Sequence, residues 1–132
     1  MIGKVKHNAM LHIILFNFVD WVEADGKYEL ELTDSAREMS EHIALYKKLY
    51  GDKWRDHIAI DSKHLPSYKT PDICRAIDFK LKHNGSYLTG NEIEFIVKAY
   101  CKLFGCNYGL GVGNKYVHFD IRSKITEWEY DY

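Results

Sequence analysis

The most informative stretch of this chain, near its C-terminal end, is Tyr116-Val117-His118-Phe119-Asp120-Ile121-Arg122. It predicts a strand, and because alternate side chains of a strand point to the same side, His118 and Asp120 share one face. Histidine nitrogens and carboxylate oxygens are ligands that zinc favours. The stretch therefore presents His118 as a candidate ligand, with Asp120 able to support it or a neighbouring ligand from behind.

Two more candidate ligands lie upstream on a pair of short motifs. Ser62-Lys63-His64-Leu65-Pro66 contains His64, and Arg75-Ala76-Ile77-Asp78 contains Asp78 after a polar loop. That loop can bring the end of one element beside the next strand. Two histidines and one carboxylate make a three-ligand shell for zinc, with the fourth position open for water. Each of these side chains, taken singly, is more often structural than ligating, so the signal lies in their combination.

The bulk composition describes one soluble globular domain spanning residues 1–132. Hydrophobic residues make up 46% of the chain and charged residues 28%. The 18 basic and 19 acidic residues nearly balance, and no block rich in Lys and Arg occurs. Such a chain lacks the electrostatic footprint of a nucleic-acid partner. The odd number of cysteines argues against a disulfide framework. We also expect the protein to be a monomer.

An apolar run near the N-terminus, residues 9–16, superficially resembles a signal peptide. His12 and Asn17 interrupt it, no small-residue cleavage site follows, and the run is too short to cross a bilayer. We expect a buried helix there, no membrane span, and a protein made in the cytoplasm without an export signal.

Hydrophobic periodicity predicts helices over residues 9–25, 36–50 and 91–104. Strands are predicted over 27–33, 57–61, 76–81 and 116–122, with a glycine-rich connection at 105–113 and a tail around Trp128. Asp34 or Ser35 would cap the second helix and Asn91 the third. Because strands and helices do not alternate regularly, the expected class is α+β, a small single domain whose central, mostly antiparallel sheet is flanked by helices.

Four short motifs follow one another in a distinctive order along the chain. They are Thr33-Asp34-Ser35-Ala36-Arg37, Ser62-Lys63-His64-Leu65-Pro66, Arg75-Ala76-Ile77-Asp78, and Gly109-Leu110-Gly111-Val112-Gly113 with Val117-His118-Phe119-Asp120-Ile121-Arg122. This order resembles the zinc D-Ala-D-Ala carboxypeptidase and L-alanyl-D-glutamate endopeptidase family, which includes many phage endolysins. The resemblance covers roughly residues 30 to 130 and implies a hedgehog/DD-peptidase-like fold.

The resemblance implies a role for each matching residue. His64, Asp78 and His118 would ligate Zn²⁺, and Arg37 would bind a substrate carbonyl or carboxylate through its two-pronged guanidinium. Ser62 would hold a backbone or substrate group, or cap a turn. The implied activity is that of a zinc metallopeptidase cutting amide bonds in peptidoglycan peptides, at the cell wall or within a virion.

Two features depart from the family pattern. The loop between His64 and Asp78 is longer than in many members, and Lys115 and Tyr116 occupy positions where several branches place a general base. Asp120 could serve as the base, or Tyr116 could assist as an electrophile. A second hypothesis follows: a catalytically inactive, zinc-stabilised domain that binds cell-wall peptides or has a structural role in a phage particle. A third is a metal-free interaction module whose histidines are structural.

Overall fold

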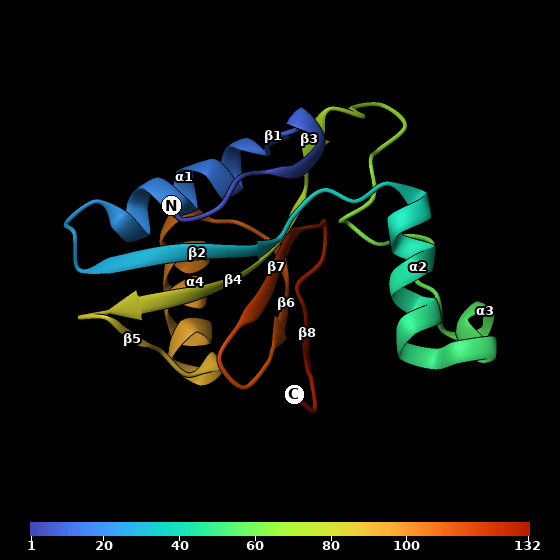
Figure 1. The fold of residues 1–132 in the computed structure, drawn as a ribbon. Coiled ribbons are helices and arrows are strands. Elements are labelled where there is room, and N and C mark those ends of the chain that lie inside the picture. Colours follow the sequence, from blue (N-terminus) through green and yellow to red (C-terminus); the bar gives the residue numbers. More distant parts are fainter.

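A six-stranded sheet forms the centre of the protein (Figure 1). The computed structural model describes residues 1–132, and its strands follow the order β2-β4-β7-β6-β8, with β5 paired to β4. They are β2 (Tyr28–Asp34), β4 (Ala76–His83), β5 (Ser86–Tyr87), β6 (Tyr108–Val112), β7 (Val117–Ile121) and β8 (Thr126–Glu129). Every neighbouring pair is antiparallel except β6 with β8. The predicted α+β class with a mostly antiparallel sheet is confirmed.

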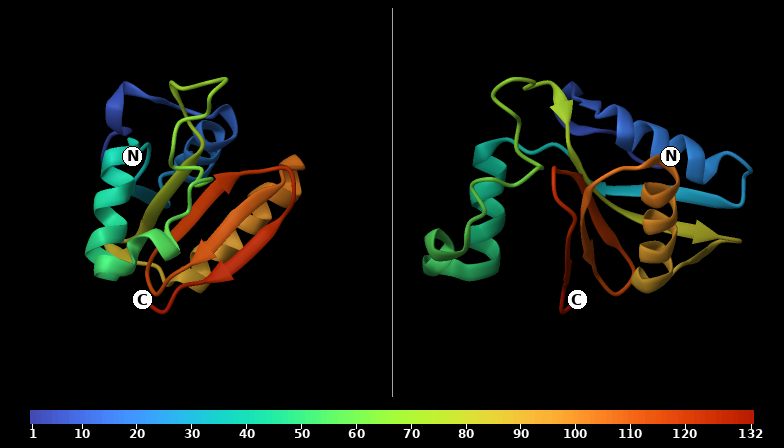
Figure 2. Two further views of the ribbon diagram at one scale, coloured as in Figure 1. Left: turned by 90° about the vertical axis from the view of Figure 1, so that its right-hand side faces the viewer. Right: turned by 180° about the vertical axis from the view of Figure 1, so that it is seen from behind.

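Two long helices, α1 (Ile13–Glu23) and α4 (Gly90–Phe104), lie beside the sheet (Figures 1 and 2). Each places an apolar stripe in the core, as Phe18 does from α1 and Val97 from α4, both fully buried. α4 begins where the Thr89 hydroxyl accepts from the backbone N–H of Glu92, and it ends at a left-handed glycine. These contacts leave the opposite face of the sheet free of both helices.

Alternation along the strands separates the two faces of the sheet. On β7, Val117 and Phe119 are fully buried in the core cluster, and on β4 so are Ile77 and Phe79. The residues between them must point to the other face, because side chains alternate along a strand. The polar residues of β4 and β7 therefore gather on the face that α1 and α4 do not cover.

A helical lobe projects beside that second face. It consists of α2 (Met39–Tyr50), the short 3₁₀ turn η2 (Gly51–Lys53) and α3 (Trp54–His57) (Figures 1 and 2). An irregular segment, residues 58–72, returns from the lobe to the sheet. The segment ends at β3 (Ile73–Cys74), which pairs in parallel with β1 (Met10–Leu11) near the N-terminus. A short 3₁₀ turn, η1 (Lys6–Asn8), precedes β1.

Several predicted boundaries are wrong. Residues 57–61 form no strand, because α3 ends at His57 and a turn follows. The first helix begins at Ile13, since residues 10–11 pair as β1 instead. The second begins only after Glu38, whose backbone N–H donates to the Glu41 carboxylate at 3.0 Å. The cap of the third is Thr89, two residues before the expected Asn91.

Besides the two-residue strands β1, β3 and β5, two longer strands escaped the sequence analysis altogether. The glycine-rich segment expected to be a connection contains β6, and the expected tail contains β8. Glycine has low strand propensity, so the composition of β6 hid it, and β8 is short and mostly exposed. No helix is both long and apolar enough to cross a membrane.

Candidate metal centre

A transverse row of the sheet supplies two of the three predicted ligands. Asp78 of β4 and His118 of β7 are direct cross-strand partners. Directly opposite residues of neighbouring strands project to the same face. Continuing the row, Gly111 of β6 lies opposite His118, and Trp128 of β8 lies opposite Gly111. The metal-binding candidates and an aromatic side chain thus share one line on the uncovered face.

A β-bulge adds an acidic residue to the other end of this row. Leu32 pairs with Phe79, whereas Asp34 pairs with the adjacent residue Asp78, so Thr33 has no partner. One extra residue in a strand reverses the side-chain alternation beyond it. Leu32 still packs against the core, and Asp34 turns to the face that carries Asp78.

His64 reaches the same point from the irregular segment above the sheet. Its ring Nδ1 lies 2.6 Å from the carbonyl oxygen of Ser35, so Nδ1–H donates and Nε2 keeps a lone pair. The backbone N–H of His64 also donates to the Ser62 hydroxyl at 3.3 Å. With the neighbouring Leu65 buried, these bonds fix the position of the imidazole. Ser62 therefore caps the turn that leads into His64, one of the two roles expected for it.

His118 is oriented by a carboxylate behind it. Its Nε2 lies 2.7 Å from Oδ2 of Asp120, so Nε2–H donates, and Nδ1, which carries the lone pair when the imidazole is neutral, faces Asp78. Asp120 in turn accepts from the Arg122 guanidinium at 2.7 Å and 2.5 Å, and its side chain is 1% exposed. Both carboxylate oxygens already accept hydrogen bonds. The structure thus places Asp120 in the supporting position behind His118, the arrangement that fixes the tautomer of a metal ligand.

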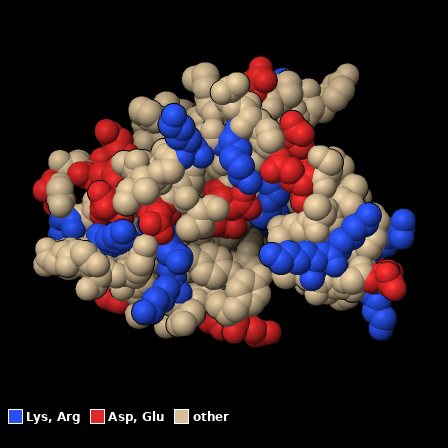
Figure 3. Space-filling model, viewed as in Figure 1, with Lys and Arg blue, Asp and Glu red and all other residues tan.

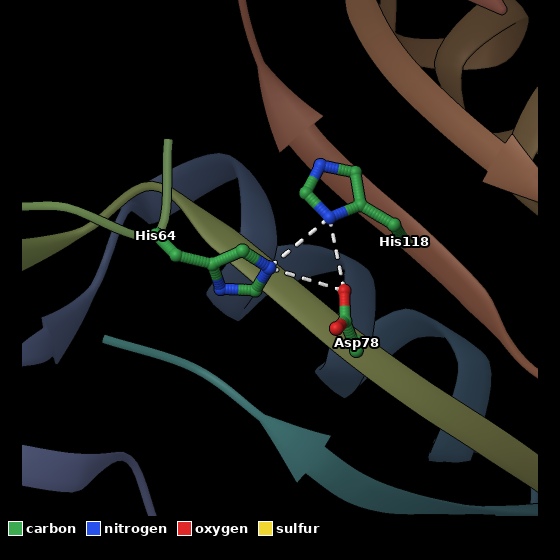
Figure 4. Close-up of side chains that lie close together, drawn as sticks. All are labelled: His64, Asp78 and His118. Carbon is green, nitrogen blue, oxygen red and sulfur yellow. Dashed lines mark hydrogen bonds and ion pairs between the residues drawn. The ribbon is translucent and has the colours of Figure 1, made fainter. Parts of the chain in front are cut away.

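The three predicted ligand atoms converge (Figure 4). His64 Nε2 lies 3.1 Å from His118 Nδ1 and 3.2 Å from Asp78 Oδ1, and the latter two atoms are 2.9 Å apart. Zinc bonds of about 2.0–2.1 Å in a tetrahedron separate the ligand atoms by about 3.3 Å. Two lone pairs and a carboxylate oxygen at such spacing fit a shared cation, so the residues present suit Zn²⁺.

The ionisation of these groups follows from their contacts. Burial by itself raises the pKa of Asp78 and lowers that of His118. Hydrogen bonds and charge interactions with the two histidines outweigh burial and hold the pKa of Asp78 below its ordinary range. Hydrogen bonds to Asp120 and Asp78 raise the pKa of His118 to about 9, and His118 and Arg122 lower that of Asp120 to about 2. In the metal-free protein these contacts favour a protonated, cationic His118 beside an ionised Asp78.

Arg37 lies at the edge of this centre. Its Nε and Nη2 donate to Asp34 Oδ2 at 2.8 Å and 2.6 Å, and Nη2 lies 3.9 Å from Asp78 Oδ2. Its backbone N–H donates to the carbonyl of His64 at 2.8 Å. The side chain is 11% exposed and lines the groove beside the ligands. Arg37 is therefore ion-paired, with the guanidinium held next to the candidate ligand atoms.

A groove of about 1000 Å³ opens over the centre, between the sheet and the helical lobe (Figure 3). Its lining includes all seven residues singled out from the sequence: Arg37, Ser62, His64, Asp78, Tyr116, His118 and Asp120. Burial first, and neighbouring Tyr132 and Tyr130 next, raise the pKa of Tyr116 far above its usual range. Its hydroxyl therefore stays protonated and remains a hydrogen-bond donor on a residue that lines the groove.

The sequence analysis missed how the glycines of β6 shape this groove. A Cβ on Gly111 would lie 2.4 Å from Nε1 of Trp128, and one on Gly113 would lie 2.1 Å from the Tyr116 ring. A Cβ on Gly109 would lie 2.3 Å from both Asp120 and Arg122. Glycine at every second position was the signal for a strand with one bare face, over which larger side chains lie.

A second cluster lies on the surface. His7, Glu38 and Glu41 offer ligand atoms close together, but the Lys6 ammonium lies 3.6 Å from Glu41 Oε2 and supplies the positive charge there. That cluster is an ion-pair network joining η1 to the start of α2.

Comparison with protein-family models, curated proteins and solved structures finds no match to this chain. The family resemblance rests on the four sequence motifs, and the function is inferred from them and from the geometry of the centre.

Proposed function

We propose that this protein is a zinc-dependent metallopeptidase that hydrolyses amide bonds in peptidoglycan stem peptides or cross-links. The observation that carries the proposal is the convergence of His64, Asp78 and His118 at the floor of an open groove. Both imidazoles are held in the tautomer that presents a lone pair to the same point. A purely structural histidine cluster would not require that arrangement.

Each residue has a role in this proposal. Zinc, when bound, lowers the pKa of its water and polarises a carbonyl. His64, Asp78 and His118 hold the ion, and Asp120 keeps His118 in its ligating orientation. Arg37 stabilises negative charge on the substrate, because a guanidinium donates parallel hydrogen bonds. Tyr116 donates a hydrogen bond from its protonated hydroxyl, assisting as an electrophile.

A specific observation favours the second candidate, an inactive zinc-stabilised domain that binds cell-wall peptides or serves in a phage particle. Both carboxylate oxygens of Asp120 already accept hydrogen bonds, from His118 and Arg122, which leaves Asp120 poorly placed to act as a general base. Lys115 and Tyr116 lie at the positions that carry a general base in several branches of the similar family. In this case the same three residues hold zinc for stability, and the groove binds without cleaving.

Metal content and peptide release test the two candidates together. Wild type, His118→Ala and the matched control His83→Ala, at the far end of β4, are purified and analysed for zinc. Each is then incubated with purified peptidoglycan, and released amines are quantified. One equivalent of zinc with cleavage lost only in His118→Ala supports the peptidase. Zinc without cleavage by any variant supports the binding domain, and absence of bound metal overturns both.

A further inference from the structure

Three tyrosines form an aromatic surface on one wall of the groove. The rings of Tyr116, Tyr130 and Tyr132 have centroids 5.5–6.1 Å apart in all three pairs. Their planes differ by 17° to 34°. Three nearly equidistant rings of similar tilt form one aromatic cluster on the groove wall, which we call the tyrosine platform.

The backbone holds the tyrosine platform in place. The N–H of Tyr130 donates to the carbonyl of Val112 at 2.9 Å, and the carbonyl of Tyr132 accepts from Asn114 at 2.9 Å. These bonds continue the pairing of β8 with β6 beyond the end of the strand. Bare positions at Gly111 and Gly113 let the rings of Tyr130 and Tyr116 approach the sheet closely. The platform is therefore built before any ligand arrives, which lowers the entropic cost of binding.

A second aromatic wall lies across the groove on α2. Tyr46 and Tyr50 stack with centroids 5.8 Å apart and planes 24° apart, and both line the groove that the platform lines. Tyr50 and Tyr132 remain 42% and 65% exposed. The groove separating the lobe from the sheet is visible in Figure 3. Its volume of about 1000 Å³ is at the upper end for small-ligand sites and far exceeds the needs of a dipeptide.

Charged groups edge the aromatic walls. Asp61, Lys63, Glu129 and Asp131 all line the same groove. A pyranose ring has an apolar face of C–H groups, which packs on an aromatic ring, and a rim of hydroxyl and amide groups, which bond to carboxylates and ammonium groups. An acyl chain would leave the rim charges unpaired, at a cost in desolvation. The combination of clustered aromatic side chains with a polar rim suits a saccharide.

We infer that the tyrosine platform and the α2 tyrosines form a subsite for the amino-sugar rings of the glycan strand, beside the metal centre. This inference rests on the proposed function, because that glycan carries the stem peptides. A ligand anchored by its sugar would present the attached peptide to the metal-binding residues at the floor of the same groove. The substrate is then a glycan-linked peptide rather than a free one.

Equilibrium binding of a peptide-free glycan tests the subsite. A tetrasaccharide of alternating N-acetylglucosamine and N-acetylmuramic acid is titrated into the protein, with intrinsic fluorescence as the readout. A peptidase cannot cut this probe, so binding is measured without turnover. We expect saturable binding that weakens about tenfold in Tyr132→Ala and in Tyr50→Ala, one ring from each wall. Tyr68→Ala is the matched control, because Tyr68 is 100% exposed and lies outside the groove lining.

Lack of saturable binding would overturn the inference, and so would binding that survives both groove substitutions unchanged. An equal loss in Tyr68→Ala would also overturn it, because the effect would not be specific to the groove. Peptide release is scored separately. A protein that releases peptides but does not bind the tetrasaccharide retains the proposed function and loses the subsite. One that binds the tetrasaccharide without releasing peptides retains the subsite and loses the peptidase.

Discussion

His118 and Trp128 contact each other although their strands are not neighbours. β6 separates β7 from β8, and the two rings meet across Gly111 with centroids 5.3 Å apart. Gly111 makes this possible because it has no side chain to fill the space between them. The indole also lies under the Arg122 guanidinium, 5.2 Å from the ring centroid. Gly111 thus links the candidate metal centre to the aromatic wall of the groove.

Gly111→Ala tests that link. A Cβ there would lie 2.4 Å from Trp128 Nε1 and 2.6 Å from Tyr130, so the indole must move. We expect a loss of about 1–3 kcal/mol in the free energy of unfolding, together with a shift in tryptophan emission. The measurement is urea denaturation followed by fluorescence. Gly105→Asn, at a left-handed helix end with open space around it, serves as the control and should change stability by only a few tenths of a kcal/mol. Unchanged stability in Gly111→Ala would contradict the packing argument.

Asp120→Asn should weaken zinc binding while leaving the three ligands in place. The neutral amide of asparagine replaces a charged carboxylate that accepts hydrogen bonds from His118 and Arg122. The orientation of the His118 imidazole is then less well held. We expect zinc affinity to fall about 10–100-fold, measured by competition with a chromophoric chelator. Asp52→Asn, on the exposed turn η2, is the control. Equal affinities in the two variants would show that Asp120 does not support the metal ligand.

Arg37→Lys should separate substrate binding from metal binding. The ammonium of lysine cannot reproduce the two hydrogen bonds to Asp34 and also reach the groove. We expect peptide release from peptidoglycan to fall about 100-fold, with zinc content unchanged. Arg55→Lys, an exposed residue of α3 that lies over Trp54, is the matched control. A loss of zinc in Arg37→Lys would instead assign Arg37 to the integrity of the centre.

The metal-free protein should lose stability as the pH rises. Its His118 has a folded-state pKa raised to about 9, against about 6.5 in the unfolded chain. A raised pKa stabilises the fold fully below the unfolded value, and that contribution disappears as the pH rises through the folded value. We expect the melting temperature in chelator to fall by several degrees between about pH 6.5 and pH 9. Zinc-saturated protein should not show this fall, since the ion replaces the proton.

His118→Asn supplies the control for the pH dependence. Removing the titrating imidazole should flatten the melting temperature over that interval in chelator. A profile with the same slope in His118→Asn and in wild type would assign the pH dependence to another group.

The sequence alone was enough to predict elements whose periodicity is strong and local. α4 repeats Ile93, Val97 and Tyr100 at helical spacing, and β7 alternates Val117 and Phe119 with His118 and Asp120. Both elements were predicted because the repeat of a helix or strand determines which of its side chains face the core, and that repeat is visible in the local sequence. The three candidate ligands were also identified, through the order of their motifs, and the structure brings them together.

Only the tertiary structure decided which residues stand beside one another across the sheet. The bulge at Thr33 that turns Asp34 toward Asp78, and the row from His118 through Gly111 to Trp128, depend on pairing between segments distant in the chain. Such pairing is set by the packing of the whole sheet rather than by local propensity. Glycine at alternate positions of β6 lowers strand propensity while making room for the groove. The glycines that weakened the sequence signal for a strand are therefore the residues that shape the groove.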